Sequence, residues 1–252
     1  GMRAMHTIDY DGPVAITRDI HWVGRHEHGL ELHCNPYLLL DDDTAVLIDP
    51  GSIPDFPVVM RKIIDLTSPQ LISLIVASHQ DPDVCSNLAV VEDVIERPDL
   101  HIAAHSATLR LIRHFGLRSP LLAVDRCNWQ VSLPSGRVLE FIHTPHLHCA
   151  GSIMTFDRAT GTLFSSDLFG ASDEEAWALF GDGAYAGTMT DWHQAMMPAN
   201  HLLRSCMARV RALPIQRICP QHGSVIEGDG IERAIAHLER LPVALDLMGS
   251  AH

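Results

Sequence analysis

The stretch that decides the fold of this chain is Leu71-Ile72-Ser73-Leu74-Ile75-Val76-Ala77, which is followed at once by Ser78-His79-Gln80-Asp81-Pro82-Asp83. The first part is a short apolar segment of the kind that forms a buried strand. The second part places His79, Asp81 and Asp83 two residues apart, where that strand ends. A polar turn built from Asp and Pro, with no metal-binding role, would explain the same residues. The interpretation therefore depends on the rest of the chain.

Three further polar residues follow apolar segments in the second half of the chain. His148 ends Thr144-Pro145-His146-Leu147-His148, Asp167 follows Leu163-Phe164-Ser165-Ser166, and His222 lies in Cys219-Pro220-Gln221-His222-Gly223. Each of them alone is typical of an ordinary loop, but all the pieces together are improbable by chance. Imidazoles and carboxylates at strand ends predict a site for two metal ions. The predicted ligands are His79, Asp81, Asp83, His148, Asp167 and His222.

Composition excludes several classes of protein. The formal charge of −13 argues against nonspecific nucleic-acid binding, which needs clustered Lys and Arg. The 6 cysteines include no C-x-x-C pair, which argues against a disulfide framework or a thiolate zinc site, and they fit a reducing compartment. No apolar segment approaches the roughly 18–20 residues that cross a bilayer. We expect a cytoplasmic protein that binds neither membrane nor nucleic acid.

The order of the expected elements suggests the fold class. No linker or repeat divides the chain, so we expect a single domain over residues 1–252. Strands and then helices occur twice, which favours an α/β protein with two sheets packed face to face and helices outside. The expected strands are Val14–Thr17, Ile20–Val23, Tyr37–Leu40, Ala45–Ile48, Leu71–Ala77, His101–Ala104, Trp129–Leu133, Val138–Ile142, Ile153–Phe156, Thr162–Ser165 and Ile215–Cys219. The expected helices are Phe56–Leu66, Leu88–Ile95, Ala107–Phe115 and Asp191–Leu213, with a loop over Gly170–Gly187.

These motifs resemble those of the metallo-β-lactamase superfamily over nearly the whole chain. The matching pieces are Asp49-Pro50-Gly51, the His79 cluster, the His148 segment up to Gly151-Ser152, Leu163–Asp167 and His222-Gly223. The resemblance implies a four-layer αββα sandwich with a two-metal site at one edge of the sheets. The first motif departs from the H-x-H-x-D-H of the hydrolases, because Asp81 replaces the second histidine and Val84 the last.

With these two replacements, the motif resembles that of one branch of the superfamily, the flavodiiron proteins and the related oxygen-binding diiron proteins. The branch is similar at H-x-E/D-x-D, at Trp22-Val23-Gly24 and at Leu163–Gly170. It implies that His79, Asp81 and His148 hold one iron, that Asp83 and His222 hold the other, and that Asp167 bridges them. The chemistry agrees, because replacing imidazole by carboxylate makes a harder, more anionic site that suits iron or manganese better than zinc.

The leading hypothesis is a non-haem diiron protein that binds or reduces O2 or NO. We expect no flavin on this chain, since 252 residues leave no room for a flavodoxin-like domain and contain no Gly-rich phosphate loop. A separate redox protein would then reduce the site, or the protein would be an oxygen sensor. The alternative is a dinuclear hydrolase of thioesters, lactones or phosphodiesters that holds zinc or manganese. A metal kept only for stability is a third possibility, and a homodimer stays open.

A few residues are weaker candidates for contact with the site. Tyr185 and His26 could reach the pocket and touch a ligand carboxylate or bound oxygen, as could His28 and His33. Cys85 and Cys149 adjoin predicted ligands in the sequence. We expect neither cysteine to be a ligand, because neighbouring residues of a strand point to opposite faces.

Overall fold

Two mixed sheets form the centre of the molecule in a computed structural model that describes residues 7–30, 32–172 and 177–249. The first sheet has the order β1-β2-β3-β4-β5-β6-β7. Its strands are β1 (Val14–Ala15), β2 (Ile20–Trp22), β3 (Tyr37–Asp41), β4 (Thr44–Ile48), β5 (Ile72–Val76), β6 (His101–Ala104) and β7 (Leu121–Ala123). The second has the order β13-β12-β11-β10-β9-β8. Its strands are β8 (Gln130–Ser132), β9 (Val138–His143), β10 (Ile153–Asp157), β11 (Thr162–Ser166), β12 (Arg217–Pro220) and β13 (Ile226–Glu227).

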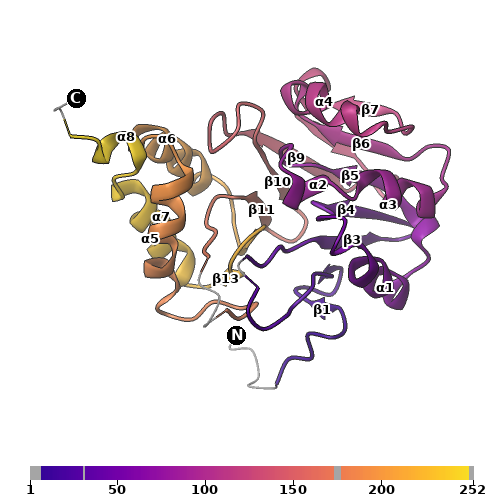
Figure 1. Ribbon diagram of the computed structural model, residues 1–252, viewed down its shortest axis with the longest axis horizontal. Coiled ribbons are helices and arrows are strands. Elements are labelled where there is room, and N and C mark those ends of the chain that lie inside the picture. Colours follow the sequence, from indigo (N-terminus) through magenta and orange to yellow (C-terminus); the bar gives the residue numbers. More distant parts are fainter. Residues whose placement is uncertain (1–6, 31, 173–176, 250–252) are drawn as a thin grey trace.

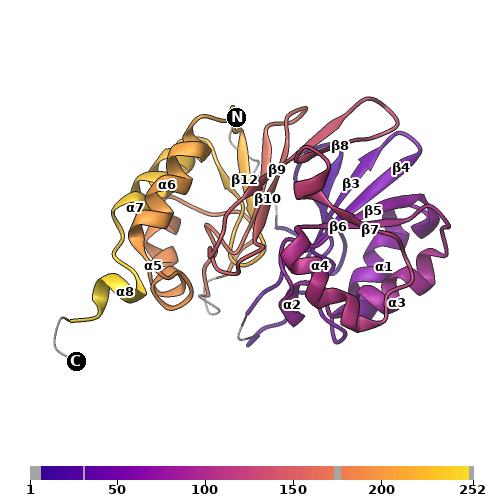
Figure 2. The same ribbon diagram turned by 90° about the horizontal axis from the view of Figure 1, so that it is seen from above.

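Helices cover the outer face of each sheet, as Figures 1 and 2 show. Those beside the first sheet are α1 (Phe56–Leu66), α2 (Pro82–Cys85), α3 (Leu88–Ile95) and α4 (Ser106–Ile112). Those beside the second are α5 (Tyr185–Met196), α6 (Asn200–Arg211) and α7 (Gly230–Arg240), with the short α8 (Ala244–Leu247) near the C-terminus. Short 3-10 turns occupy Pro69–Leu71, Arg113–Phe115 and Val124–Arg126. The order helix, sheet, sheet, helix confirms the four-layer αββα sandwich.

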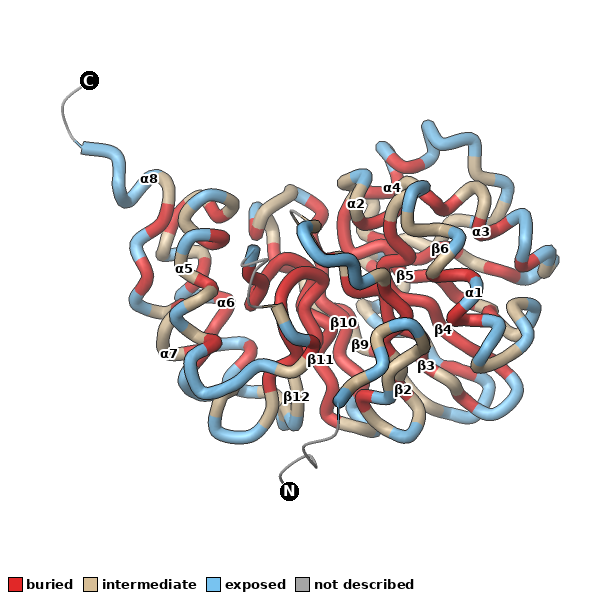
Figure 3. Tube along the Cα trace, turned by 60° about the horizontal axis from the view of Figure 1, so that its bottom comes forward, coloured by how far each residue is buried: buried red, intermediate tan, exposed pale blue. Residues whose placement is uncertain are grey.

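The core lies in three layers, one between the sheets and one between each sheet and its helices. Trp22, Tyr37 and Phe164 pack between the sheets. All five residues of β4 are buried, and so are all five of β11. Figure 3 shows these buried strands between partly exposed helices. Strands covered on both faces lose the alternation of apolar and polar residues, which is why Leu71–Ala77 appeared as one apolar run.

The prediction of one long helix over Asp191–Leu213 is wrong. The structure has α5 and α6 instead, separated by Met197-Pro198-Ala199. Pro198 has no backbone N–H and its ring clashes with the preceding turn, so the first helix ends before it. The predicted loop over Gly170–Gly187 is also too long, because α5 begins at Tyr185. Among the described residues, no helix is long and apolar enough to cross a membrane.

Candidate metal centre

The six predicted ligands converge from four segments that are distant in sequence. His79 follows the end of β5, and Asp81 and Asp83 lie at the start of α2. Asp167 follows β11 directly, and His222 lies just beyond β12. The fourth segment is the loop between β9 and β10, which carries His148. The Ile153 amide donates to the Ser78 carbonyl at 3.1 Å, so the start of β10 in one sheet is joined to the end of β5 in the other.

The first half-site consists of His79, Asp81 and His148. His148 Nε2 lies 2.9 Å from Asp81 Oδ2 and 2.9 Å from Asp167 Oδ2. His79 Nε2 lies 3.4 Å from Asp81 Oδ2 and 3.2 Å from the same oxygen of Asp167. The two imidazole nitrogens therefore share one oxygen of Asp81 and one oxygen of Asp167.

The second half-site consists of Asp83 and His222. His222 Nε2 lies 2.9 Å from Asp83 Oδ2 and 3.5 Å from Asp167 Oδ1. Asp167 thus turns one carboxylate oxygen toward each half-site. This is the arrangement of a bridging carboxylate.

Buried atoms without partners test whether these residues fit a cation. His79 Nε2, His222 Nε2 and Asp167 Oδ1 are buried, and within the described part of the chain none of them makes a hydrogen bond. Leaving a buried polar atom unsatisfied costs about 1–3 kcal/mol, more when the group is charged. Bound cations would satisfy all three atoms at once. The residues therefore fit a metal centre.

The electrostatics of the cluster lead to the same conclusion. Burial lowers the pKa of His79, but the neighbouring Asp167 and Asp81 outweigh it and raise the pKa to about 10. The hydrogen bonds that His148 donates to the carboxylates of Asp167 and Asp81 raise its pKa to about 12. Burial works to raise the pKa of Asp167, yet the surrounding histidines hold it well below the usual range. The carboxylates attract positive charge strongly, whether it comes from protons or from metal ions.

Contacts behind the candidate ligands orient both buried imidazoles. His79 Nδ1 lies 3.0 Å from Ser166 Oγ, and His222 Nδ1 lies 2.9 Å from the backbone oxygen of His33. Each contact turns Nε2 toward Asp167, as is usual for metal-binding histidines. Asp49 accepts from the Ser78 amide at 2.8 Å and from its hydroxyl at 2.7 Å, which holds the residue before His79. Sequence analysis did not identify these supporting roles of Ser166 and Asp49.

Burial raises the pKa of Asp49 to about 6, while its hydrogen bonds from Ser78 act in the opposite direction. Trp192 holds the backbone of Asp167, because its Nε1 donates to the Asp167 carbonyl at 2.9 Å. The Trp192 ring also meets the His222 ring edge-on, with centroids 4.9 Å apart. Trp192 packs as a buried residue of α5, and the same side chain contacts two candidate ligands, Asp167 and His222.

The expectation that Cys149 is not a ligand stays a prediction, but the reason given for it is wrong. Its sulfur lies within 4.8 Å of the ligand atoms of His79, Asp81 and His148. The expectation assumed a strand, whose neighbouring side chains alternate, but Cys149 is in the loop between β9 and β10. Cys34, which sequence analysis did not single out, has the same proximity to Asp83 and His222. Cys85 is buried, and its thiol donates weakly to the backbone oxygens of His79 and Asp81.

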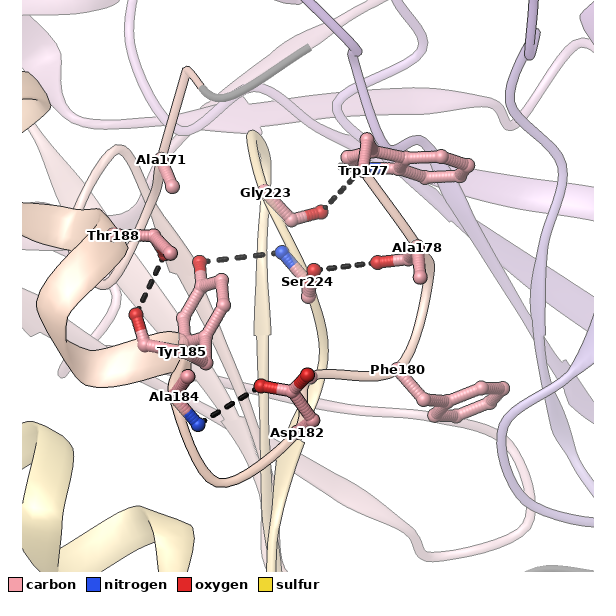
Figure 4. Close-up of a pocket in the computed structure, with 11 residues that line it drawn as sticks. Ala171, Trp177, Ala178, Phe180, Asp182, Ala184, Tyr185, Thr188, Gly223 and Ser224 are labelled. Atoms are coloured by element: carbon pink, nitrogen blue, oxygen red, sulfur yellow. Dashed lines mark hydrogen bonds between the residues drawn. The ribbon is translucent and has the colours of Figure 1, made fainter. Parts of the chain in front are cut away.

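Tyr185 lies beside Gly223 and Ser224, which follow His222, and its hydroxyl points toward the Ser224 amide (Figure 4). Its hydroxyl donates to the Phe169 carbonyl at 2.5 Å and accepts from the Ser224 amide at 3.2 Å. A Cβ at Gly223 would lie 2.4 Å from this oxygen, so glycine is needed for the close approach. The hydroxyl is therefore hydrogen-bonded to the backbone just after Asp167 and just after His222. Any role of Tyr185 at the candidate centre would be to position these two residues.

His26 lies on an exposed segment, and its ring stacks on Trp177 with centroids 4.8 Å apart. His26 Nδ1 lies 3.0 Å from His33 Nε2. Among the described residues, its contacts reach the candidate centre through His33, whose backbone oxygen contacts His222. His28 is exposed, and the structure brings it to none of the candidate ligands.

The sequence model of the ODP family beta lactamase matches residues 32–223. This chain belongs to that family. The solved apo state of the chemotaxis sensor ODP from T. denticola is similar to it, with a TM-score of 0.80 and 24% identity over 93% of this chain and 96% of that one. The peroxy diiron species of the chemotaxis sensor ODP matches with a TM-score of 0.78 and 24% identity, over 93% of this chain and 97% of that chain.

The flavodiiron protein from Giardia intestinalis has the same fold, with a TM-score of 0.82, 20% identity, and 93% of this chain aligned with 60% of that one. The anaerobic nitric oxide reductase flavorubredoxin of Vibrio vulnificus is 24% identical over 84% of this chain and 46% of its own length. The ODP family member thus spans only about a third to a half of such curated relatives. The similarity to these longer proteins supports the fold of this chain. It does not assign their activities to it.

Proposed function

We propose that this chain is a non-haem diiron protein that binds O2, or NO, between two irons held by the six converging residues. His79, Asp81 and His148 would hold one iron, Asp83 and His222 the other, and Asp167 would bridge them. The single observation that carries the proposal is the orientation of Asp167, whose two oxygens face different half-sites. Membership of the family that includes the sensor ODP, solved as a peroxy diiron species, supports iron and oxygen as the ligands.

The charge of the candidate ligands suits two divalent ions. Three carboxylates contribute −3 against +4, which leaves the site nearly neutral. The three carboxylates also make it harder than the histidine-rich site of a zinc hydrolase, and this favours iron or manganese. Ions separated by roughly 3.5–4 Å would match the usual two-metal geometry. The bound irons would supply the electrons for oxygen chemistry.

The chain's own residues would bind the irons from a buried side and leave a second side accessible. Asp167 and His222 have exposed fractions of 2% and 0% for their side chains, whereas Asp81 and Asp83 have 31% and 34%. A small molecule would therefore approach past Asp81 and Asp83. The buried imidazoles would keep water from the opposite side, and their Nδ1 contacts would stop the rings from turning.

We further propose that electrons come from a separate redox protein, or that the protein is a sensor that needs only one reduction event. This chain would bind no flavin. A sensor reacts once with O2 after reduction, whereas a reductase with a suitable donor turns over continuously. Oxygen consumption with and without an added electron-transfer protein would separate the two.

The decisive experiment combines elemental analysis with optical spectra. Purified protein loaded anaerobically with Fe(II) should contain about two irons per chain and should develop a near-ultraviolet charge-transfer band on exposure to O2 or NO. The control is protein loaded with Zn(II), which should stay colourless. If the zinc form hydrolysed a thioester and the spectrum of the iron form did not change with O2 or NO, the protein would be a hydrolase and this proposal would be wrong.

A further inference from the structure

The two half-sites offer different numbers of protein donors. The first supplies His79, Asp81 and His148 in addition to the shared Asp167. The second supplies only Asp83 and His222 beside the other oxygen of Asp167. Val84, which stands where the hydrolase motif has its last histidine, is wholly buried and apolar. The second half-site would therefore hold its ion with fewer ligands, unless another residue contributes.

Cys34 lies where such a ligand is needed. Its sulfur, an oxygen of Asp83 and a ring nitrogen of His222 are all within 4.8 Å of one another. Sulfur and nitrogen bound to one tetrahedral ion, at about 2.3 and 2.1 Å, lie about 3.6 Å apart. A side-chain adjustment of about 1 Å would therefore bring all three donors onto one ion.

The residues on either side of Cys34 are bonded to the loop that carries His222. The His33 carbonyl accepts from His222 Nδ1 at 2.9 Å, and the Asn35 amide donates to the Gln221 carbonyl at 2.7 Å. The Asn35 side chain adds bonds to the carbonyls of Pro220 at 3.1 Å and Gly223 at 2.9 Å. Its own oxygen accepts from Trp22 Nε1 at 3.0 Å. Cys34 is thus held in a fixed position relative to His222.

An independent observation indicates that a ligand belongs beside this thiol. His222 Nε2 is fully buried and, among the described residues, makes no hydrogen bond, although its ring is aimed at Asp83 and Asp167. Cys34 therefore adjoins a buried donor that an ion would satisfy.

Cys149, by contrast, lies beside its histidine and not in front of it. Its sulfur is 3.7 Å from His148 Nδ1 and 3.8 Å from Nε2. An ion bound to Nε2 lies on the far side of that nitrogen from Nδ1, so a sulfur on the ion would be clearly nearer to Nε2. The equal distances place Cys149 alongside the ring, in a half-site that already has more donors.

We propose that Cys34 is a protein ligand of the ion held by Asp83 and His222. The inference rests on the proposed two-ion site and adds a ligand to it. On binding, the thiol releases its proton to solvent while a sulfur–metal bond forms, and no electron is transferred. The thiolate adds one negative charge and makes the second half-site softer than the first. The two positions should therefore differ in metal preference, with the second favouring zinc or cobalt over manganese more strongly.

Cobalt(II) gives a direct test, because sulfur bound to Co(II) produces a near-ultraviolet charge-transfer band that oxygen and nitrogen ligands do not produce. Wild-type protein loaded anaerobically with two Co(II) ions should show this band. Cys34→Ser should lose the band and bind the second Co(II) at least about tenfold more weakly, while the first ion binds as before. Cys149→Ser is the matched control and should keep both the band and the affinity.

A second measurement uses unaltered protein, so it does not depend on whether a variant folds. X-ray absorption of the wild-type protein loaded with Zn(II) should show sulfur at about 2.3 Å from part of the zinc. Two bound ions without sulfur in either measurement, or a band that survives in Cys34→Ser, would overturn the role of Cys34 and leave the two-ion site standing. A wild-type chain that binds no divalent metal would instead refute the proposed function, and the inference with it.

Discussion

The two half-sites share one carboxylate but are built differently. The first takes its histidines from two sheets, since His79 follows β5 and His148 lies in the loop before β10. The second takes its only histidine from the segment after β12, and the backbone of His33 supports that ring. His148 is partly exposed with a fraction of 19%, whereas His222 is fully buried. The first half-site is thus richer in donors and has one partly exposed histidine, while each half-site has one carboxylate that is about a third exposed.

The difference begins with two residues that are almost adjacent. Asp81 has an extended backbone and precedes α2, while Asp83 lies in the first turn of that helix. In a strand the two side chains would share one face. Because the chain turns into a helix between them, Asp81 faces His148 and Asp83 faces His222. One short helix therefore divides a compact sequence motif between two ions.

The largest effect should come from Asp167, the residue that both half-sites share. Asp167→Ala should lose both ions or leave one weakly bound, because each of its oxygens faces a different half-site. Metal per chain, measured by elemental analysis after dialysis, checks this. The control is His146→Asn, since His146 is exposed and has a positive φ of 61°, which Asn tolerates. Equal metal loss in both variants would contradict the assignment.

The next effect should separate the half-sites. His79→Ala should weaken the ion held with Asp81 and His148, and His222→Ala the ion held with Asp83, so each variant should retain about one ion per chain. The reason is that the two imidazoles contact opposite oxygens of Asp167. Calorimetric titration with Co(II) would resolve one or two binding events. If either single variant abolished both events, the two half-sites would be one cooperative unit.

Acid should weaken the turn that carries Asp167. His193 is fully buried; its Nε2 accepts from the Phe169 amide at 3.1 Å, and burial lowers its pKa to about 4. Between pH 6.5 and about 4 the unfolded chain binds a proton that folded His193 refuses. This contribution to stability is therefore complete above pH 6.5 and lost as the pH falls, by up to about 3 kcal/mol.

Denaturant unfolding of metal-free wild type and His193→Gln across that range measures the difference. The wild type should lose more stability on acidification than the variant does. Parallel curves would show that His193 is not the group responsible, and the neutral imidazole would then have no part in holding the turn.

The smallest effect should come from Tyr185. Tyr185→Phe removes the hydrogen bonds to Phe169 and Ser224, which should cost about 1–3 kcal/mol of unfolding free energy. Because Ser224 follows His222 closely, the second ion should bind up to about tenfold more weakly while the first is unchanged. Stability and Co(II) affinity measured on the same sample check both effects. A variant that weakens the first ion equally would contradict this local role.

Local patterns predicted much of the fold correctly. The bounds of α1, α3 and β6 agree with the expected Phe56–Leu66, Leu88–Ile95 and His101–Ala104. By contrast, α7 was not expected, although Ala234, Ile235 and Leu238 form its buried face. The prediction of one helix over Asp191–Leu213 is wrong because its apolar spacing continues past Pro198, whereas a proline, which has no backbone N–H, ends the first helix there.

What the sequence by itself determined is the set of donor types and their positions after apolar strands, because strand periodicity and ligand chemistry are local properties. Only the tertiary structure decided that Asp81 and Asp83 face different half-sites and that Cys34 lies close to His222. It also decided that Ser166 contacts His79 and that Asp49 holds Ser78. Cys34 and His222 are far apart along the chain, and no sequence motif at either residue predicts contact with the other. Their proximity follows from backbone and side-chain hydrogen bonds between His33–Asn35 and the segment after β12, which form only when the two sheets pack together.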